Sequence, residues 1–397
     1  MTSSLHFIVA GGGIGGLAAA CVLARGGHRV TVLEQQAQFG EIGAGIQLGP
    51  NIFRMFEYLG LTAAVDEVAF FPPGMGMNDV RTGEEVVHVP LGDAVKSVYG
   101  YPYGLIYRVD LHNVFLAECA KFDNVQLRTS SKLDSFEHDS SGVTVKLASG
   151  ESIRGDALIG ADGLWSRVRE AIVGDGKPRV SGHIAYRAVL KREDVPAHLW
   201  NDEVLLWGGE KTHLVHYPLR RGELFNLVAV FHSNKYDEGW NTFGDTAELN
   251  ERFAHAVPQV KELLGKIETW KMWVLCDREP VKDWSRGRAT LLGDAAHPML
   301  QYLAQGAGQA IEDAVVLGAA VKAARGNIEE AFLKYQQARY LRTGRVQLTA
   351  RFYGDIYHAA GVTRELRNRM FQSGKESAGF AGLKWMYEGI DPTRLFA

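Results

Sequence analysis

The sequence predicts an α/β fold with three parts: a Rossmann-type dinucleotide domain, an inserted domain built on a mixed sheet, and a helical C-terminus. Three observations carry this prediction. Residues 5–34 run through an apolar strand, a glycine cluster, an amphipathic helix and a second strand. Two more short apolar strands end in Gly-Ala-Asp-Gly at residues 160–163 and in Gly-Asp at residues 293–294. Between these points, several segments alternate apolar and polar residues at period two, as strands of a mixed sheet do.

The glycine cluster satisfies the G-x-G-x-x-G pattern in the strand-turn-helix context that this pattern requires. Its first glycine permits a tight turn, the second lets a pyrophosphate approach the backbone, and the third lets helix and strand pack closely. The second strand ends in Glu34, whose carboxylate could accept hydrogen bonds from an unphosphorylated ribose, as in FAD or NAD, and would repel a 2′-phosphate. The residues expected to bind the dinucleotide here are Gly11, Gly13, Ile14, Gly15, Gly16 and Glu34.

Length and composition narrow the class of protein. A chain of 397 residues should form two or three domains, and a net charge of -3 argues against a nucleic-acid partner. Three cysteines without a C-x-x-C pair predict neither disulfides nor a zinc site, so we expect no metal and a cytoplasmic location. No apolar run is long enough to predict a membrane span.

Changes in composition and periodicity suggest where the three parts lie. The dinucleotide domain is expected at residues 1–73, 104–177 and 276–324, the inserted domain at 74–103 and 178–275, and the helical C-terminus at 325–397. The first domain should carry a small meander with strands at 124–127, 143–147 and 152–154. Amphipathic patterns predict long helices at residues 245–264 and 328–358.

The inserted domain contains a predicted hairpin of two strands, at residues 212–219 and 224–232. Successive side chains of a strand point to opposite faces. His213 and Tyr217 therefore share one face of the first of these strands, and His216 lies on the other.

Two acidic side chains directly follow strands of the predicted first sheet. Asp162 and Asp294 each come after an apolar strand, and open α/β sheets bind ligands at the carboxyl ends of their strands. Gly306, Ala307 and Gly308 then begin an apolar helix, whose unpaired N–H groups and positive dipole end would attract an anion. We therefore expect all five to line the cofactor site, although each motif alone could be an ordinary turn or a packing contact.

Arg108 and Gln47 are further candidates for the cofactor site. Asp110 is expected to be the N-cap of a helix over residues 111–122, and Arg108 stands just before it. Arg108 could therefore point at a diphosphate or at the edge of a flavin, or it could form a surface salt bridge. Gln47 lies in a glycine-rich loop that precedes another predicted helix.

Taken together, these motifs resemble the three fingerprints of the single-component FAD-dependent aromatic hydroxylases. The resemblance covers about residues 5 to 350 and rests on the glycine motif with Glu34, on the turn at 160–163, and on Gly293-Asp294 with His297-Pro298. Gln47 and Arg108 also stand where that family contacts its flavin. The Rossmann-type domain would then be an FAD-binding domain, and the inserted domain would bind the substrate.

Within that family, one branch is the most similar. The sequence Ala307-Gly308-Gln309 looks like that of the salicylate hydroxylases and the 3-hydroxybenzoate 6-hydroxylases. His213, Tyr217 and Gln301 most resemble the second of these groups.

The resemblance implies a flavin cycle. NADH would reduce the bound FAD, dioxygen would form a C4a-hydroperoxide, and its distal oxygen would attack an electron-rich carbon of a small aromatic acid. The expected reaction is para-hydroxylation of 3-hydroxybenzoate to 2,5-dihydroxybenzoate (gentisate), by a homodimer. The alternatives are a decarboxylating salicylate 1-hydroxylase or another hydroxylase of phenolic acids. A halogenase lacks support, because no WxWxIP signature follows Trp270, and a non-enzymatic FAD redox sensor would oxidise no NADH with any phenol.

Hydroxylation of a phenol requires that the ring be activated as the phenolate. A phenol titrates near pH 10, so a base within hydrogen-bond reach is useful, and histidine has the best-matched pKa. We expect His213 to take the phenolic proton, Gln301 to support the same oxygen, and Tyr217 to line the pocket or meet the carboxylate. The pattern alone does not distinguish His213 from an ordinary hydrogen-bonded sheet histidine, or from His216.

Overall fold

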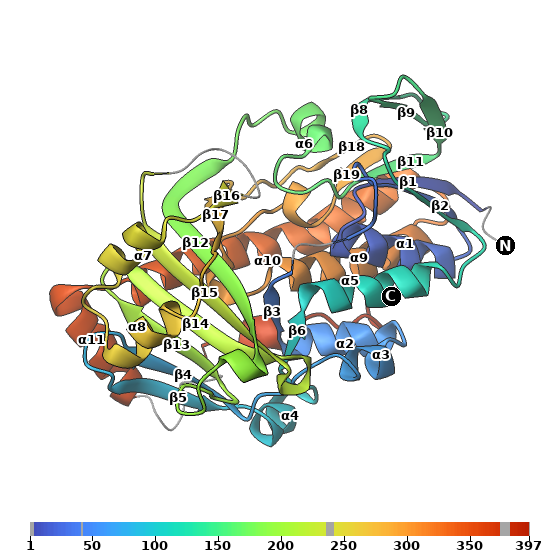
Figure 1. The fold of residues 1–397 in the computed structure, drawn as a ribbon. Helices are drawn as coiled ribbons and strands as arrows, with labels where there is room; N and C mark the ends of the chain where they lie inside the picture. Colours follow the sequence, from blue (N-terminus) through green and yellow to red (C-terminus); the bar gives the residue numbers. More distant parts are fainter. Residues whose placement is uncertain (1–3, 41–42, 236–241, 374–381, 397) are drawn as a thin grey trace.

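The computed structural model describes residues 4–40, 43–235, 242–373 and 382–396. A six-stranded sheet and an eight-stranded sheet organise these ranges. Figure 1 shows them on opposite sides of the molecule, with the long helix α10 (Ile328–Tyr357) extending from one toward the other. Within the described residues, no helix is both long and apolar enough to cross a bilayer.

The six-stranded sheet is built around β1. Its spatial order is β18 (Ser285–Arg286), β19 (Ala289–Leu291), β11 (Ala157–Gly160), β1 (His6–Ala10), β2 (Arg29–Leu33) and β7 (Val125–Arg128). All neighbours pair in parallel except β18 and β19. Parallel strands are usually covered on both faces, and Phe7, Ile8 and Val9 of β1 are fully buried. The carboxyl ends of β1, β11 and β19 are therefore neighbours at one edge.

Helices cover this sheet and connect its strands. They are α1 (Ile14–Arg25), α2 (Pro50–Tyr58), α3 (Thr62–Asp66), α5 (Arg108–Cys119), α6 (Arg167–Ile172) and α9 (Gly306–Ala323). Helix α1 packs against α5 and α9, and α10 packs on α9. The short strands β3 (Gly45–Leu48) and β6 (Gly104–Tyr107) form a separate antiparallel pair.

The eight-stranded sheet joins two distant parts of the sequence. Its order is β16 (Thr242–Phe243), β17 (Lys271–Asp277), β12 (Arg179–Lys191), β15 (Leu224–His232), β14 (Thr212–Leu219), β13 (Val204–Gly209), β4 (Gly74–Asp79) and β5 (Glu85–Pro90). Strand β14 pairs with β15 as the predicted hairpin, from Thr212 opposite Phe231 to Leu219 opposite Leu224. Only β13 and β4 pair in parallel.

The two faces of this sheet bury different side chains. The outer face packs on α7 (Thr246–Arg252) and α8 (Pro258–Leu264), through residues such as Leu214 and Phe231. The inner face packs on α10 and on the short helix η4 (Gln301–Leu303), through residues such as Tyr217 and Val230. In Figure 1, α7 and α8 lie on the side of the sheet away from α10. The remaining short helices are η1 (Arg192–Asp194), η2 (Arg220–Gly222), η3 (Gly293–Ala295), α4 (Asp93–Tyr99), α11 (Gly361–Ser373) and α13 (Lys384–Tyr387).

Three expected elements differ from the structure. The strand predicted at 124–127 is β7 at the edge of the first sheet, and the meander instead contains β8 (Leu133–His138), β9 (Val143–Leu147) and β10 (Ser152–Gly155). The helix predicted over 245–264 is two helices: α7 ends at Arg252, and Pro258, which is unfavourable inside a helix but suited to its first position, begins α8. Helix α5 begins at Arg108, two residues before the predicted N-cap. The long helix predicted at 328–358 is α10, although part of the C-terminus beyond it lies outside the described residues.

Candidate active site

The glycine turn after β1 contacts both later acidic turns. A Cβ on Gly11 would lie 2.2 Å from the carbonyl oxygen of Ala161, and Gly11 has a φ of +109°, which glycine adopts readily. A Cβ on Gly15 would lie 2.9 Å from Leu292 and 3.0 Å from Ala310 of α9. The turns near residues 11, 162 and 293 therefore converge at the carboxyl edge of the first sheet.

Two helix N-termini also meet at this edge. Helix α1 follows Gly13 and α9 follows Gln305, and neither has a side-chain cap or an acidic residue in its first turn. The space beside Gly306 is open, because a Cβ there would find one atom within 4 Å, Asp294 Oδ1 at 3.9 Å. Free N–H groups and two positive dipole ends suit a large anionic ligand, so the residues present fit a dinucleotide such as FAD.

The remaining members of the two glycine motifs serve close packing as well. A Cβ on Gly16 would lie 2.0 Å from the carbonyl oxygen of Gly11, and one on Gly308 would lie 2.8 Å from the Ile52 side chain. Ile14 is buried at the start of α1, and Ala307 is half-buried at the start of α9. Close approach at these positions explains why small residues recur there.

Two of the three carboxylates predicted at the edge of the first sheet, Glu34 and Asp162, accept hydrogen bonds from backbone N–H groups. Glu34 accepts hydrogen bonds from the N–H of Gly12 at 3.0 Å and of Gln36 at 2.8 Å, which fixes it beside the glycine turn. Asp162 accepts from Ser166 Oγ and from the N–H groups of Arg167 and Val168, so it binds the first turn of α6, whose N-cap is Ser166. Burial raises the pKa of Asp162. The contacts of both residues with the cofactor stay predictions.

Arg108 and Gln47 stand where the two sheets meet. The backbone N–H of Arg108 donates to Ala44 at 2.9 Å, and Gln47 Oε1 accepts from the Tyr103 hydroxyl at 2.6 Å. The predicted capping role of Asp110 is wrong. Asp110 binds Arg220 through two hydrogen bonds of 2.6 and 2.7 Å, so it ties α5 to the hairpin of the large sheet.

A buried charge network, which the sequence did not reveal, supports the turn at residue 293. Asp313 Oδ2 accepts from the Gly293 N–H at 2.9 Å and binds His297 Nε2 at 2.6 Å. Arg339 of α10 donates to Asp313 Oδ1 at 2.7 Å. Burial alone would raise the pKa of Asp313, but His297 and Arg339 together lower it. His297 therefore helps to hold the turn through Asp313, in addition to its place just before Pro298.

The second acid of α9 continues this network. Glu312 accepts from Arg339 at 2.6 Å, from Arg342 at 2.7 Å and from Asn51 at 2.8 Å. Against the effect of burial, Arg342 and Arg339 lower its pKa to about 2. The network fixes α9, with its open N-terminus, to both α10 and α2.

The large sheet separates the two histidines of β14. His213 lies on the inner face, with ring centroids 5.6 Å from Tyr302 and 5.7 Å from Tyr357. His216 lies on the outer face and accepts a hydrogen bond from Trp207 Nε1 at 3.0 Å. Burial lowers the pKa of each to about 3. The inner face packs against η4, which begins at Gln301. His213 is therefore the histidine of β14 that lies on the same side of the sheet as Gln301.

His213 and Gln301 reach the inner face together but bind different partners. His213 Nδ1 lies 2.7 Å from His358 Nε2, and Gln301 Oε1 accepts from Arg187 Nη2. Tyr302, next to Gln301, contacts the His213 ring. Tyr217, on the same face of β14, is buried, and burial raises its pKa.

Arg187 is a residue that the sequence analysis missed. It pairs with no carboxylate in the described parts of the chain, its buried Nε has no hydrogen-bond partner there, and its guanidinium lies 5.2 Å from the Trp273 ring. Burial lowers its pKa to about 10, with a contribution from the charge of Arg108, so the group stays cationic at neutral pH. A signal was present in the sequence, because His183 and Arg187 are four positions apart on β12 and therefore share one face of the strand.

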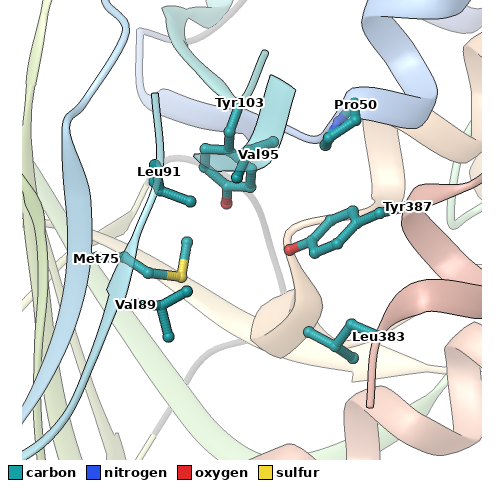
Figure 2. Close-up of a pocket in the computed structure, with 8 residues that line it drawn as sticks. All are labelled: Pro50, Met75, Val89, Leu91, Val95, Tyr103, Leu383 and Tyr387. Carbon is teal, nitrogen blue, oxygen red and sulfur yellow. The ribbon is translucent and has the colours of Figure 1, made fainter. Parts of the chain in front are cut away.

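A small pocket borders this region without being the active site. Figure 2 shows side chains of β4, β5 and α4 facing Leu383 and Tyr387 from the C-terminal segment, with Tyr103 beside them. Its volume of about 20 Å³ has room for about one water molecule, and its lining is mostly apolar. It is too small for an aromatic acid.

Comparisons with known proteins show what the chain is similar to. Residues 4–347 match the family model described as FAD binding domain. The chain is 44% identical to a 3-hydroxybenzoate 6-hydroxylase of Polaromonas naphthalenivorans, covering 97% of this chain and 96% of that one. It is 42% identical to a 3-hydroxybenzoate 6-hydroxylase of Klebsiella oxytoca, covering 98% and 97%.

A solved structure gives the same picture of the fold. HpxO of Klebsiella pneumoniae, in complex with FAD and uric acid, has a TM-score of 0.84 and 28% identity, covering 98% of this chain and 97% of that one. The chain therefore binds FAD. We expect the cofactor to lie in the cradle formed by the turns at residues 11, 162 and 293 and by the N-termini of α1 and α9.

Proposed function

The chain belongs to the FAD-dependent aromatic hydroxylases, and from this premise we propose that it converts 3-hydroxybenzoate to 2,5-dihydroxybenzoate with NADH and dioxygen. The observation that carries the proposal is the inner face of the large sheet. It combines a neutral histidine, His213, with a buried cation, Arg187, that forms no ion pair with a carboxylate of the described residues; both lie beside the same short helix η4. These two groups suit a hydroxyl and a carboxylate on one ring. The names of the relatives favour the same substrate.

FAD, when bound and reduced, supplies the electrons and the activated oxygen of the reaction. The chain's own residues do the rest. The open N-terminus of α9 would favour negative charge on the reduced cofactor. The turns at residues 11 and 293 would hold the cofactor at the sheet edge.

His213 would act on the phenolic hydroxyl. Its Nδ1 is engaged by His358, which leaves Nε2 to accept the proton and produce the phenolate. A phenolate directs attack to its ortho and para carbons. Position 6 of 3-hydroxybenzoate is para to the hydroxyl, so attack there yields 2,5-dihydroxybenzoate.

Arg187 would hold the carboxylate through charge-assisted hydrogen bonds, which are stronger than neutral ones. Gln301 would then position the guanidinium, in addition to its predicted contact with the phenolic oxygen. A homodimer, which the resemblance implies, also stays a prediction.

The test is a panel of 2-, 3- and 4-hydroxybenzoate, each with NADH and with NADPH. We expect 3-hydroxybenzoate with NADH to be the best pair, with 2,5-dihydroxybenzoate as the product and no release of carbon dioxide. Preferred turnover of 2-hydroxybenzoate with one carbon dioxide per NADH would instead identify a salicylate 1-hydroxylase. Bound FAD without NADH oxidation by any phenol would support the non-enzymatic sensor.

A further inference from the structure

We propose that His358 and His232 pass on the proton that His213 takes from the substrate, so that three histidine rings form a relay to solvent. The inference rests on the proposed function, because it assigns His213 the role of first acceptor. His358 and His232 touch neither substrate nor cofactor in this assignment, so they are positioning and relay residues.

The geometry of the three rings is continuous. His213 Nδ1 lies 2.7 Å from His358 Nε2, and His358 Nδ1 lies 2.9 Å from His232 Nε2. His213 is 3% exposed and His358 is 7% exposed, whereas His232 is only partly buried. The chain of hydrogen bonds therefore leads from a buried position toward the surface.

The three rings come from separate elements and meet by folding. His213 belongs to β14 and His232 to β15, and His358 is the C-cap residue that follows α10. His358 uses both of its ring nitrogens for these two contacts. Any buried histidine needs a hydrogen-bond partner for each ring nitrogen. A relay additionally requires that both partners can accept and donate a proton, as the two histidine partners of His358 can.

The proton count of the relay closes. His213 Nε2 takes the phenolic proton while Nδ1 gives its own proton to His358 Nε2. His358 Nδ1 gives its proton to His232 Nε2, and His232 Nδ1 releases one proton to water. The substrate becomes a phenolate, each ring stays neutral, and each ring changes tautomer. A proton that travels the reverse way when the product leaves restores the starting tautomers.

The surroundings favour transfer over storage of the proton. Burial, together with His183 and His232, lowers the pKa of His213 to about 3, and burial also lowers the pKa of His358. A ring with such a pKa does not keep a proton at neutral pH. The proton must therefore move on for the phenolate to persist.

The other titratable groups around the relay come from the elements packed on it. His183 of β12 stacks on His232 at 4.1 Å and binds the Tyr302 hydroxyl, and Tyr357 of α10 contacts His213. At the outer end, burial, Lys211 and Arg252 lower the pKa of His232, while Asp355 raises it. The charged groups that act on the relay thus lie at its exposed end, where exchange with water occurs.

The test measures proton release by the FAD-bound enzyme in weak buffer with a pH indicator, after rapid mixing with 3-hydroxybenzoate. The absorbance of the phenolate is followed in parallel. In His358→Ala and in His232→Ala, we expect both rates to fall at least 10-fold. Added imidazole should restore the rate in His358→Ala, because it can occupy the space of the missing ring.

His216→Gln is the matched control, since it changes a buried histidine of the same strand on the opposite face. We expect it to keep the wild-type rates. FAD content of each variant shows that it is folded. Wild-type proton release in His358→Ala, or a slow rate that imidazole does not restore, would overturn the relay.

A metal ion is the rival occupant, because nitrogens of His183, His232 and His358 lie within 4.8 Å of one another. Stoichiometric zinc or copper in the purified enzyme, lost in His232→Ala, would also overturn the relay. These failures differ from failure of the proposed function. In that case, the wild-type enzyme itself would not convert 3-hydroxybenzoate to 2,5-dihydroxybenzoate.

Discussion

Single residues on the inner face of the large sheet decide which chemistry is available there. Period-two alternation placed His213 and Tyr217 together and His216 apart, and the structure confirms this separation. Alternation fixes the face of a residue but not its partners. The partners of His213 and Gln301 are His358 and Arg187, which are 145 and 114 residues away in sequence. No local pattern reports such contacts.

Arg187 provides a prediction at this scale. Arg187→Gln should raise the KM for 3-hydroxybenzoate by about 10- to 100-fold, because a hydrogen bond to a charged group contributes roughly 1.5–3 kcal/mol. The KM for the neutral 3-hydroxybenzamide should change much less. Steady-state kinetics with the two ligands measure the difference.

The control for Arg187 lies on the same stretch of chain. Arg192 is exposed and stacks on Trp200 at 4.0 Å, so Arg192→Gln should leave both KM values unchanged. Equal losses for the acid and the amide in Arg187→Gln would show that the residue supports the fold and does not recognise the carboxylate.

At the scale of elements, α9 is positioned by charges that its own sequence does not explain. Glu312 and Asp313 look like ordinary residues of a helix in the sequence, and their ion-pair partner, Arg339, lies on α10. The sequence therefore predicted where α9 begins but not what holds it. For α7 and α8 the local sequence did contain a signal, because Pro258 indicates a helix start. The continuous amphipathic pattern nevertheless predicted a single helix.

Removal of Arg339 tests this support. Arg339→Leu leaves two buried carboxylates without their shared partner, and such a loss typically costs about 3–5 kcal/mol. We expect a lower urea midpoint and loss of FAD, because Asp313 also holds the Gly293 turn. Cofactor content and urea unfolding measure the two effects.

Arg345→Leu is the matched control on the same helix. Arg345 is exposed and lies 4.0 Å from the Trp385 ring, a contact that contributes about 0.5–1 kcal/mol. FAD content should stay at the wild-type level. An Arg339→Leu variant that retains FAD and the wild-type midpoint would show that the network is not needed for the cradle.

At the scale of the whole molecule, the convergence of the glycine and acidic turns was predictable, because parallel strands bring their carboxyl ends to one edge. The order and pairing of the strands in the large sheet were harder to predict from the sequence. Strand β4, at residues 74–79, pairs with β13 at residues 204–209, and the order of strands depends on such long-range pairs. Local periodicity carries no information about them, so the sequence predicted the strands of the inner face without predicting their neighbours.

Buried histidines also determine how the stability of the whole molecule depends on pH. Burial lowers the pKa of His216 to about 3, whereas a histidine in the unfolded chain titrates near 6.5. Above pH 6.5 the ring is neutral in both states. Below it the unfolded state binds more protons, so stability falls as pH falls, by up to about 1.4 kcal/mol per pH unit for this one group.

This loss begins before the buried carboxylates titrate. Glu312, with a pKa of about 2, contributes stability that is present above about pH 4.5 and is lost as pH falls toward 2. Between pH 6.5 and 4.5, the buried histidines therefore make stability rise with pH, and Asp162, whose pKa burial raises, contributes with the opposite sign. We expect His216→Gln to reduce the slope of stability against pH by about one proton, whatever its effect on stability at pH 7.5.

Urea unfolding at intervals between pH 7.5 and 4.5 measures the slope for each variant. Glutamine can accept the Trp207 hydrogen bond but does not titrate, so the substitution removes the proton-binding group and retains an acceptor. His138→Gln, which makes the same substitution at an exposed position, is the control variant and is measured in the same way. A His216→Gln variant with an unchanged slope would mean that His216 is protonated within the folded protein, and its hydrogen bond from Trp207 would then have to be absent in solution.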